Sequence, residues 1–172
     1  ASSVGTVHSG QEYAGVELVA SHGYDDCVRL FNEQVSVVLE PNLGGRILEY
    51  NRDGVNVLYI DSAQDGWTYS PGGERVAPCA GRFDFGPERT GPDRTAFWLG
   101  RWQAEITGPR SARLSSVKDD ITGIQLIRDF SLAETGSRLD IRQTIINIGD
   151  ETKHHYFWSR TFRSIILSSL RL

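Results

Sequence analysis

The sequence predicts an all-β domain, an antiparallel β-sandwich. Many short segments alternate between apolar and polar residues with a period of two, and turn residues separate them at spacings of about 8–12 residues. No segment keeps a helical period with a cap at both ends. With 172 residues, of which 39% are hydrophobic, one domain is the simplest division. We expect residues 1–12, which are small and polar, to form a flexible N-terminal arm, and residues 13–172 to form a single β-sandwich domain.

The clearest alternation lies in residues 124–132 and 138–145. In the first segment the even-numbered positions from 124 to 132 share one face and are apolar, with Arg128 as the exception. In the second, Leu139, Ile141 and Ile145 alternate with polar residues. Successive side chains of a strand point to opposite faces, so each segment offers one apolar and one polar surface. This is typical of half-buried antiparallel strands.

Seven further strands are expected from weaker alternation between turn residues. They lie at residues 27–31, 35–40, 46–50, 57–60, 101–106, 112–117 and 155–162. Residues 61–98 differ, because they hold four of the six prolines together with many glycines and six aromatic residues. A disordered linker would be poor in aromatic residues. We therefore expect an ordered, functional loop that lies across one face or mouth of the sheets.

Composition and charge argue against several classes of protein. The net charge of −4 and the scattered arginines indicate neither a nucleic-acid partner nor a membrane partner, and no apolar run approaches the roughly 20 residues of a spanning helix. No metal-ligand spacing and no cofactor-binding motif is present, so no metal and no cofactor is expected. Cys27 and Cys79 permit one disulfide, although two small buried thiols are the favoured interpretation. The start at Ala1 slightly favours a periplasmic or secreted protein.

Several segments then point to a family. Residues 35–50 and 56–59, the pair Gly81-Arg82, residues 140–147 and the run His154-His155-Tyr156-Phe157 follow one another in the order and spacing of galactose mutarotase-like proteins. The chain resembles this family, which includes the aldose 1-epimerases, over residues 35–162. Residues 81–88 and 157–160 look closer to uncharacterised bacterial aldose-epimerase-like proteins than to true mutarotases.

The resemblance implies a supersandwich of two large antiparallel sheets and a sugar or oligosaccharide as partner. It also implies acid–base ring opening at the anomeric carbon. Members of the family are longer, and their glutamate general base lies in the second half. Residues 163–172 contain no carboxylate. We therefore expect a carbohydrate-binding, aldose 1-epimerase-like protein that lacks the family's C-terminal half and either binds sugar weakly or is an incomplete enzyme.

The resemblance assigns the histidines and Arg82 to the candidate site, and side-chain chemistry adds two tryptophans and a second arginine. His154 matches the family's catalytic acid, and a shift of one residue in register would put His155 there instead. Arg82 would hold sugar hydroxyls with its donor fork. Trp98 and Trp158 would stack on the apolar faces of sugar rings, although core packing is the ordinary role of a strand tryptophan. Arg160 alternates with Trp158, and an arginine on an apolar face needs a partner or a cleft.

Two other functions stay open. Asp84 and Glu88 lie four residues apart in a loop and would serve as the carboxylate pair of a polysaccharide hydrolase or lyase. Alternatively, the chain is a non-catalytic β-sandwich module that mediates interactions. Half of a supersandwich would leave strand edges uncovered, so we also expect homo-oligomers to form through exposed sheet edges. The residues do not indicate which sugar is bound.

Overall fold

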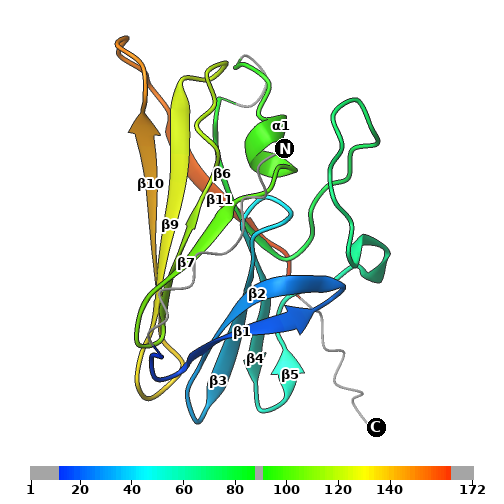
Figure 1. The fold of residues 1–172 in the computed structure, drawn as a ribbon, viewed down its shortest axis with the longest axis vertical. Coiled ribbons are helices and arrows are strands. Elements are labelled where there is room, and N and C mark those ends of the chain that lie inside the picture. The colour runs from blue at the N-terminus through cyan, green and yellow to red at the C-terminus, as the bar shows by residue number, and fades with distance from the viewer. Residues whose placement is uncertain (1–11, 88–90, 164–172) are drawn as a thin grey trace, which may run out of the picture.

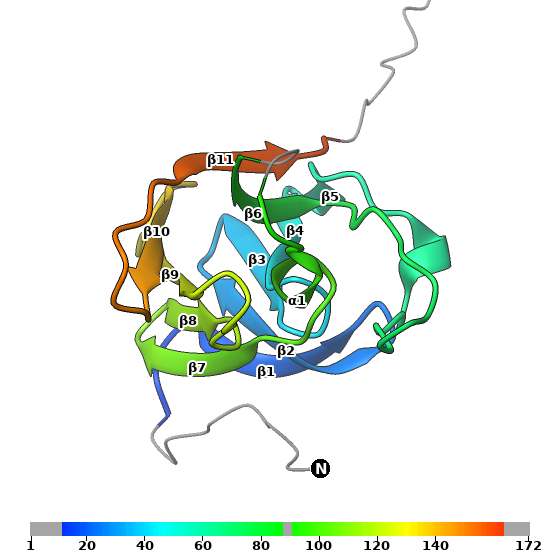
Figure 2. The same cartoon turned by 90° about the horizontal axis from the view of Figure 1, so that it is seen from above.

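The computed structural model describes residues 12–87 and 91–163 and shows two antiparallel β-sheets packed face to face (Figure 1). This confirms the prediction of an all-β, antiparallel sandwich. Seen from above, the two sheets surround a common interior, and the short helix α1 (Thr95–Trp98) lies over one end of it (Figure 2).

The larger sheet has seven strands in the order β1-β2-β3-β4-β6-β11, with β5 paired to β4. These strands are β1 (Val16–Ser21), β2 (Tyr24–Phe31), β3 (Val35–Glu40), β4 (Arg46–Arg52), β5 (Val55–Asn56), β6 (Gly81–Gly86) and β11 (Tyr156–Thr161). The first four follow one another through short turns, as sequential antiparallel strands commonly do. The partner of β6 on one side is β11, which the chain reaches only after building the second sheet.

The smaller sheet has four strands in the order β10-β9-β8-β7. They are β7 (Gln103–Gly108), β8 (Ser111–Ser115), β9 (Ile124–Leu132) and β10 (Leu139–Asn147). Burial alternates along β7, β8 and β9, so one face of this sheet packs against the larger sheet. The main core lies between the two sheets and includes Leu30, Leu39, Phe83, Trp102 and Leu126.

Arg128, the polar exception in the alternation of β9, points into this core and is only 2% exposed. Its Nη1 donates hydrogen bonds to the carbonyl oxygens of Gly45, at 2.8 Å, and of Gly81, at 3.3 Å. Burial lowers the pKa of Arg128 to about 9. The side chain thus ties β9 of one sheet to two backbone segments of the other, because a buried cation needs acceptors where water is excluded.

Several predicted boundaries were wrong. Residues 57–60 do not form a strand of their own, because the partner of β4 lies earlier, at β5. β1 was missed, since its alternation is diluted by the small residues before it. β6 and α1 both fall inside the predicted loop 61–98, as does a short 3-10 helix, η1 (Ser62–Gln64). The glycines and prolines that flank β6 hide a strand whose six residues are all buried.

A second, smaller cluster, which includes Cys27, lies apart from the main core. Beside it, Arg46 pairs with Glu40 at 3.0 Å and donates from Nη1 to Sγ of Cys79 at 3.3 Å. Both cysteines are buried and free, in agreement with the favoured interpretation of two buried thiols. Most of the predicted N-terminal arm, residues 1–11, lies outside the described residues.

Candidate functional site

β6 and β11 bring the predicted binding residues of two distant segments together. In their antiparallel register Trp158 lies opposite Asp84, and Arg160 lies opposite Arg82. Directly opposed residues share a face of the sheet, and residues two apart on one strand do so as well. Arg82, Asp84, Trp158 and Arg160 therefore occupy the same face of this strand pair.

Asp84 is the centre of this cluster and is 2% exposed. Its Oδ1 accepts a hydrogen bond from Nη1 of Arg94 at 2.6 Å, and its Oδ2 accepts one from Nε1 of Trp98 at 3.3 Å. Nε of Arg160 lies 3.9 Å from the same Oδ2. A buried carboxylate is stable only when it is paired and hydrogen-bonded. Asp84 therefore holds two guanidinium groups and one indole ring in place.

The turn before α1 brings Arg94 and Trp98 to Asp84. Oδ1 of Asp93 accepts hydrogen bonds from the backbone N–H of Thr95, at 3.1 Å, and from its hydroxyl, at 2.6 Å. Aspartate favours such positions because its short side chain satisfies the free N–H groups at a helix start. The one helical turn that follows places Trp98 four residues beyond Arg94, on the same side of the helix.

Arginines and tryptophans stack in this cluster. The guanidinium of Arg82 lies 4.5 Å from the ring centre of Trp98, and that of Arg160 lies 5.4 Å from the ring centre of Trp158. Arg82 is 3% exposed, whereas Trp158 is 40% exposed, and Trp98 is half-buried. Buried charged side chains thus lie next to aromatic rings that are partly exposed to solvent. Five of the six predicted binding residues belong to it: Arg82, Asp84, Trp98, Trp158 and Arg160.

The two histidines are placed differently. His155 lies just before β11, and its ring meets the ring of Phe85 edge to face at 5.2 Å. Phe85 belongs to the core, so His155 lies on the other side of β6 from Asp84. Both ring nitrogens of His155 are buried and have no hydrogen-bond partner among the described residues. His154 is exposed. The structure does not bring His155 to the face that carries Arg82.

Glu88 lies outside the described residues, so the structure does not place the proposed carboxylate pair. Asp84, its other member, is engaged by Arg94, Trp98 and Arg160. A nucleophile or general base of a hydrolase has to face its substrate, whereas Asp84 is enclosed by these side chains. Sequence reasoning missed Arg94. A signal was present in the run Pro92-Asp93-Arg94, which is typical of a turn or a helix start.

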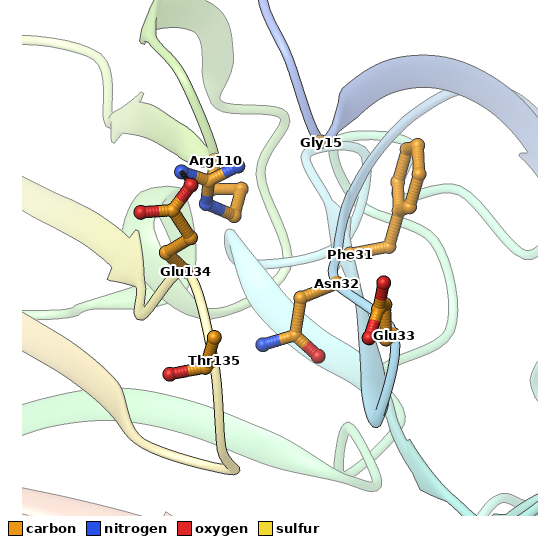
Figure 3. A pocket seen from close by; sticks show the side chains of 7 residues that line it. All are labelled: Gly15, Phe31, Asn32, Glu33, Arg110, Glu134 and Thr135. Atoms are coloured by element: carbon orange, nitrogen blue, oxygen red, sulfur yellow. Dashed lines mark ion pairs between the residues drawn. The ribbon is translucent and has the colours of Figure 1, made fainter.

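A hollow of about 580 Å³ lies where the turn before β1, the end of β2, the β7–β8 turn and the β9–β10 turn meet (Figure 3). In the figure the side chains of Arg110 and Glu134 point toward one another, and Nη2 of Arg110 lies 3.7 Å from Oε1 of Glu134. Its lining residues are Gly15, Phe31, Asn32, Glu33, Arg110, Glu134 and Thr135. None of them was a predicted site residue, and the Asp84 cluster contributes none.

A more apolar groove of about 400 Å³ lies between β4, β10 and β11, lined by Ile47, Leu58, Leu139 and Ile141 among others. The strands next to it carry exposed apolar side chains: Ile141, Ile146, Tyr156, Phe157 and Trp158. Self-association through these edges stays a prediction.

Comparisons of the chain with family models, with curated proteins and with solved structures found no match. Within residues 12–87 and 91–163, no three His, Cys, Asp or Glu side chains gather in a way that would hold a metal ion. In the same part of the chain, no helix has the length and apolar character needed to cross a membrane.

Proposed function

We propose that this chain is a carbohydrate-binding domain that recognises a sugar on the face of β6 and β11 formed by the Asp84 cluster. The observation that carries the proposal is the exposed ring of Trp158, opposite Asp84 and beside Arg160. The resemblance to galactose mutarotase-like proteins supports sugar as the ligand class.

The chemistry of the cluster suits a pyranose. The C–H faces of a sugar ring are apolar and stack on an aromatic ring, while its hydroxyls need fixed donors and acceptors. Trp158 and Trp98 offer the aromatic surface. The guanidinium of Arg160 offers several donors in a rigid plane at its border. Because Asp84 orients Trp98 and Arg160 before any ligand arrives, less conformational entropy is lost on binding.

Ring opening at the anomeric carbon requires a proton donor within hydrogen-bond reach of the bound sugar. His155 contacts Phe85 on the core side of β6, so it faces away from the Asp84 cluster, and the exposed His154 is the remaining candidate for this donor. We propose binding as the function and treat epimerisation through His154 as the alternative that the experiment separates from it.

The test is calorimetric titration of the chain with glucose and with galactose, beside polarimetry of freshly dissolved α-anomers. We expect heat of binding from at least one sugar and no acceleration of mutarotation. Trp158→Ala should weaken binding about tenfold or more, because it removes the stacking surface. Accelerated mutarotation that His154→Ala abolishes would instead favour the epimerase.

Phe157→Ala is the matched control. Phe157 neighbours Trp158, is 58% exposed and stacks on Phe83 with ring centres 6.0 Å apart, on the core side of the strand pair. We expect this variant to bind sugar as the parent does. Equal losses in Phe157→Ala and Trp158→Ala, or no binding of either sugar by the parent, would contradict the proposed function.

A further inference from the structure

We infer that the site takes an oligosaccharide, with Tyr156 as a second stacking platform beyond Trp158; this rests on the proposed function and extends it. Tyr156 was not among the predicted site residues. It begins β11, and it is 74% exposed.

The backbone of β11 sets the spacing of the two rings. Tyr156 and Trp158 are two residues apart on one strand, so their side chains share a face and their Cα atoms are about 6.8 Å apart. A single pyranose stacked on Trp158 would leave the ring of Tyr156 in solvent. A chain of linked pyranoses that follows the strand would place a neighbouring sugar over Tyr156.

The cross-strand partner leaves room for such a ligand. Tyr156 lies opposite Gly86, whereas Trp158 lies opposite Asp84. Glycine has no side chain that would cover the phenol ring from the neighbouring strand. The platform of Tyr156 is therefore open, while Trp158 lies opposite the buried Asp84 and against the guanidinium of Arg160.

The polarity of the row fits a glycan better than an apolar partner. Along one face β11 presents a phenol, an indole and a guanidinium, at Tyr156, Trp158 and Arg160. Tyrosine and tryptophan combine an apolar ring with a polar group, and arginine adds planar donors. Such a row can stack on the apolar faces of successive sugar rings and hydrogen-bond to their hydroxyls at the same time.

The test compares glucose with maltotetraose and cellotetraose by calorimetry of the whole chain. We expect one tetrasaccharide to bind about tenfold or more tightly than glucose, as a second stacking contact predicts. Tyr156→Ala should remove that gain and leave glucose affinity unchanged. Phe157→Ala, whose side chain lies on the other face of the same strand, should leave both affinities as in the parent.

Three outcomes of the calorimetry would overturn the inference. They are equal affinities for glucose and both tetrasaccharides, a tetrasaccharide gain in affinity that survives in Tyr156→Ala, and a gain that only Thr135→Ala removes. The last result would put the second contact in the hollow of Figure 3. If glucose binds without a length effect, the inference fails and the proposed function stands. If none of the sugars binds, the proposed function itself fails. The sedimentation coefficient gives a further check. If Tyr156→Ala changes it without changing the sugar affinity, this surface is an interface between protein chains, and the inference is overturned.

Discussion

Nη1 of Arg94 lies 2.6 Å from Oδ1 of Asp84, and both side chains are at least nine-tenths buried. This ion pair joins the turn before α1 to β6, two segments that the sequence separates by a Gly- and Pro-rich stretch. The other carboxylate oxygen, Oδ2, accepts from Trp98 and faces Arg160 of β11. One carboxylate thus fixes three segments that form the candidate sugar surface.

Replacing Asp84 should destabilise the folded chain. Asp84→Asn removes the negative charge that pairs with the buried Arg94, and breaking a buried pair in this way costs about 3–5 kcal/mol of unfolding free energy. Asp140→Asn is the control, because its pair with Arg138 is 57% and 78% exposed and should contribute only about 0–1 kcal/mol. Urea denaturation followed by tryptophan fluorescence measures both. Similar losses of unfolding free energy in the two variants would show that the Asp84–Arg94 pair stabilises the fold no more than an exposed ion pair does.

Gly45 should tolerate no side chain. It adopts a φ of 57°, and a Cβ there would overlap the ring of the buried Trp102. Gly45→Ala should lose about 1–2 kcal/mol from left-handed backbone strain and about 1–3 kcal/mol more from overpacking. Gly54→Ala separates the two effects, because Gly54 has a φ of 77° and a Cβ added to it would meet no atom within 4 Å. Thermal unfolding should show the larger loss for Gly45→Ala.

Alkaline pH should weaken the fold through Tyr24. Burial, followed by the nearby charge of Glu40, raises the pKa of Tyr24 from 10.0 to about 12. Between these values the unfolded chain loses the phenol proton while the folded chain keeps it, so the free energy of unfolding falls as pH rises from 10 to 12.

Tyr24→Phe should remove this part of the pH dependence, at the expense of the hydrogen bond to the carbonyl of Trp67. The control is Tyr59→Phe, because Tyr59 is 49% exposed, and this variant should keep the parent's slope. Denaturation midpoints at a series of pH values provide the measurement. A slope that Tyr24→Phe leaves unchanged would assign the alkaline loss to other groups.

The two cysteines should behave as inert thiols in the folded chain. Cys27 is 0% exposed and Cys79 is 5% exposed, and burial raises the pKa of the Cys27 thiol. Because the thiolate is the reactive form, a thiol reagent should label the native chain slowly. In denaturant without a reducing agent we expect both thiols to react. Thiols that appear only after reduction would instead reveal a disulfide.

The sequence by itself determined the fold class and which residues of β9 face the core. Alternation in β9 and β10 arises from the backbone, whose successive side chains point to opposite faces, so it can be read without tertiary contacts. The sequence also predicted five binding residues that the structure brings together, namely Arg82, Asp84, Trp98, Trp158 and Arg160. What they bind remains a proposal, because no contact within the protein identifies a ligand.

Only the tertiary structure decided which of these residues meet. The pairing of β6 with β11 joins positions 70 to 80 residues apart, and no local pattern encodes a register between distant strands. The same pairing put His155 on the core side, since a shift of one residue exchanges the two faces of a strand. Arg128 is a further case, because its acceptors are the carbonyl groups of Gly45, in the turn before β4, and of Gly81, in β6 of the opposite sheet.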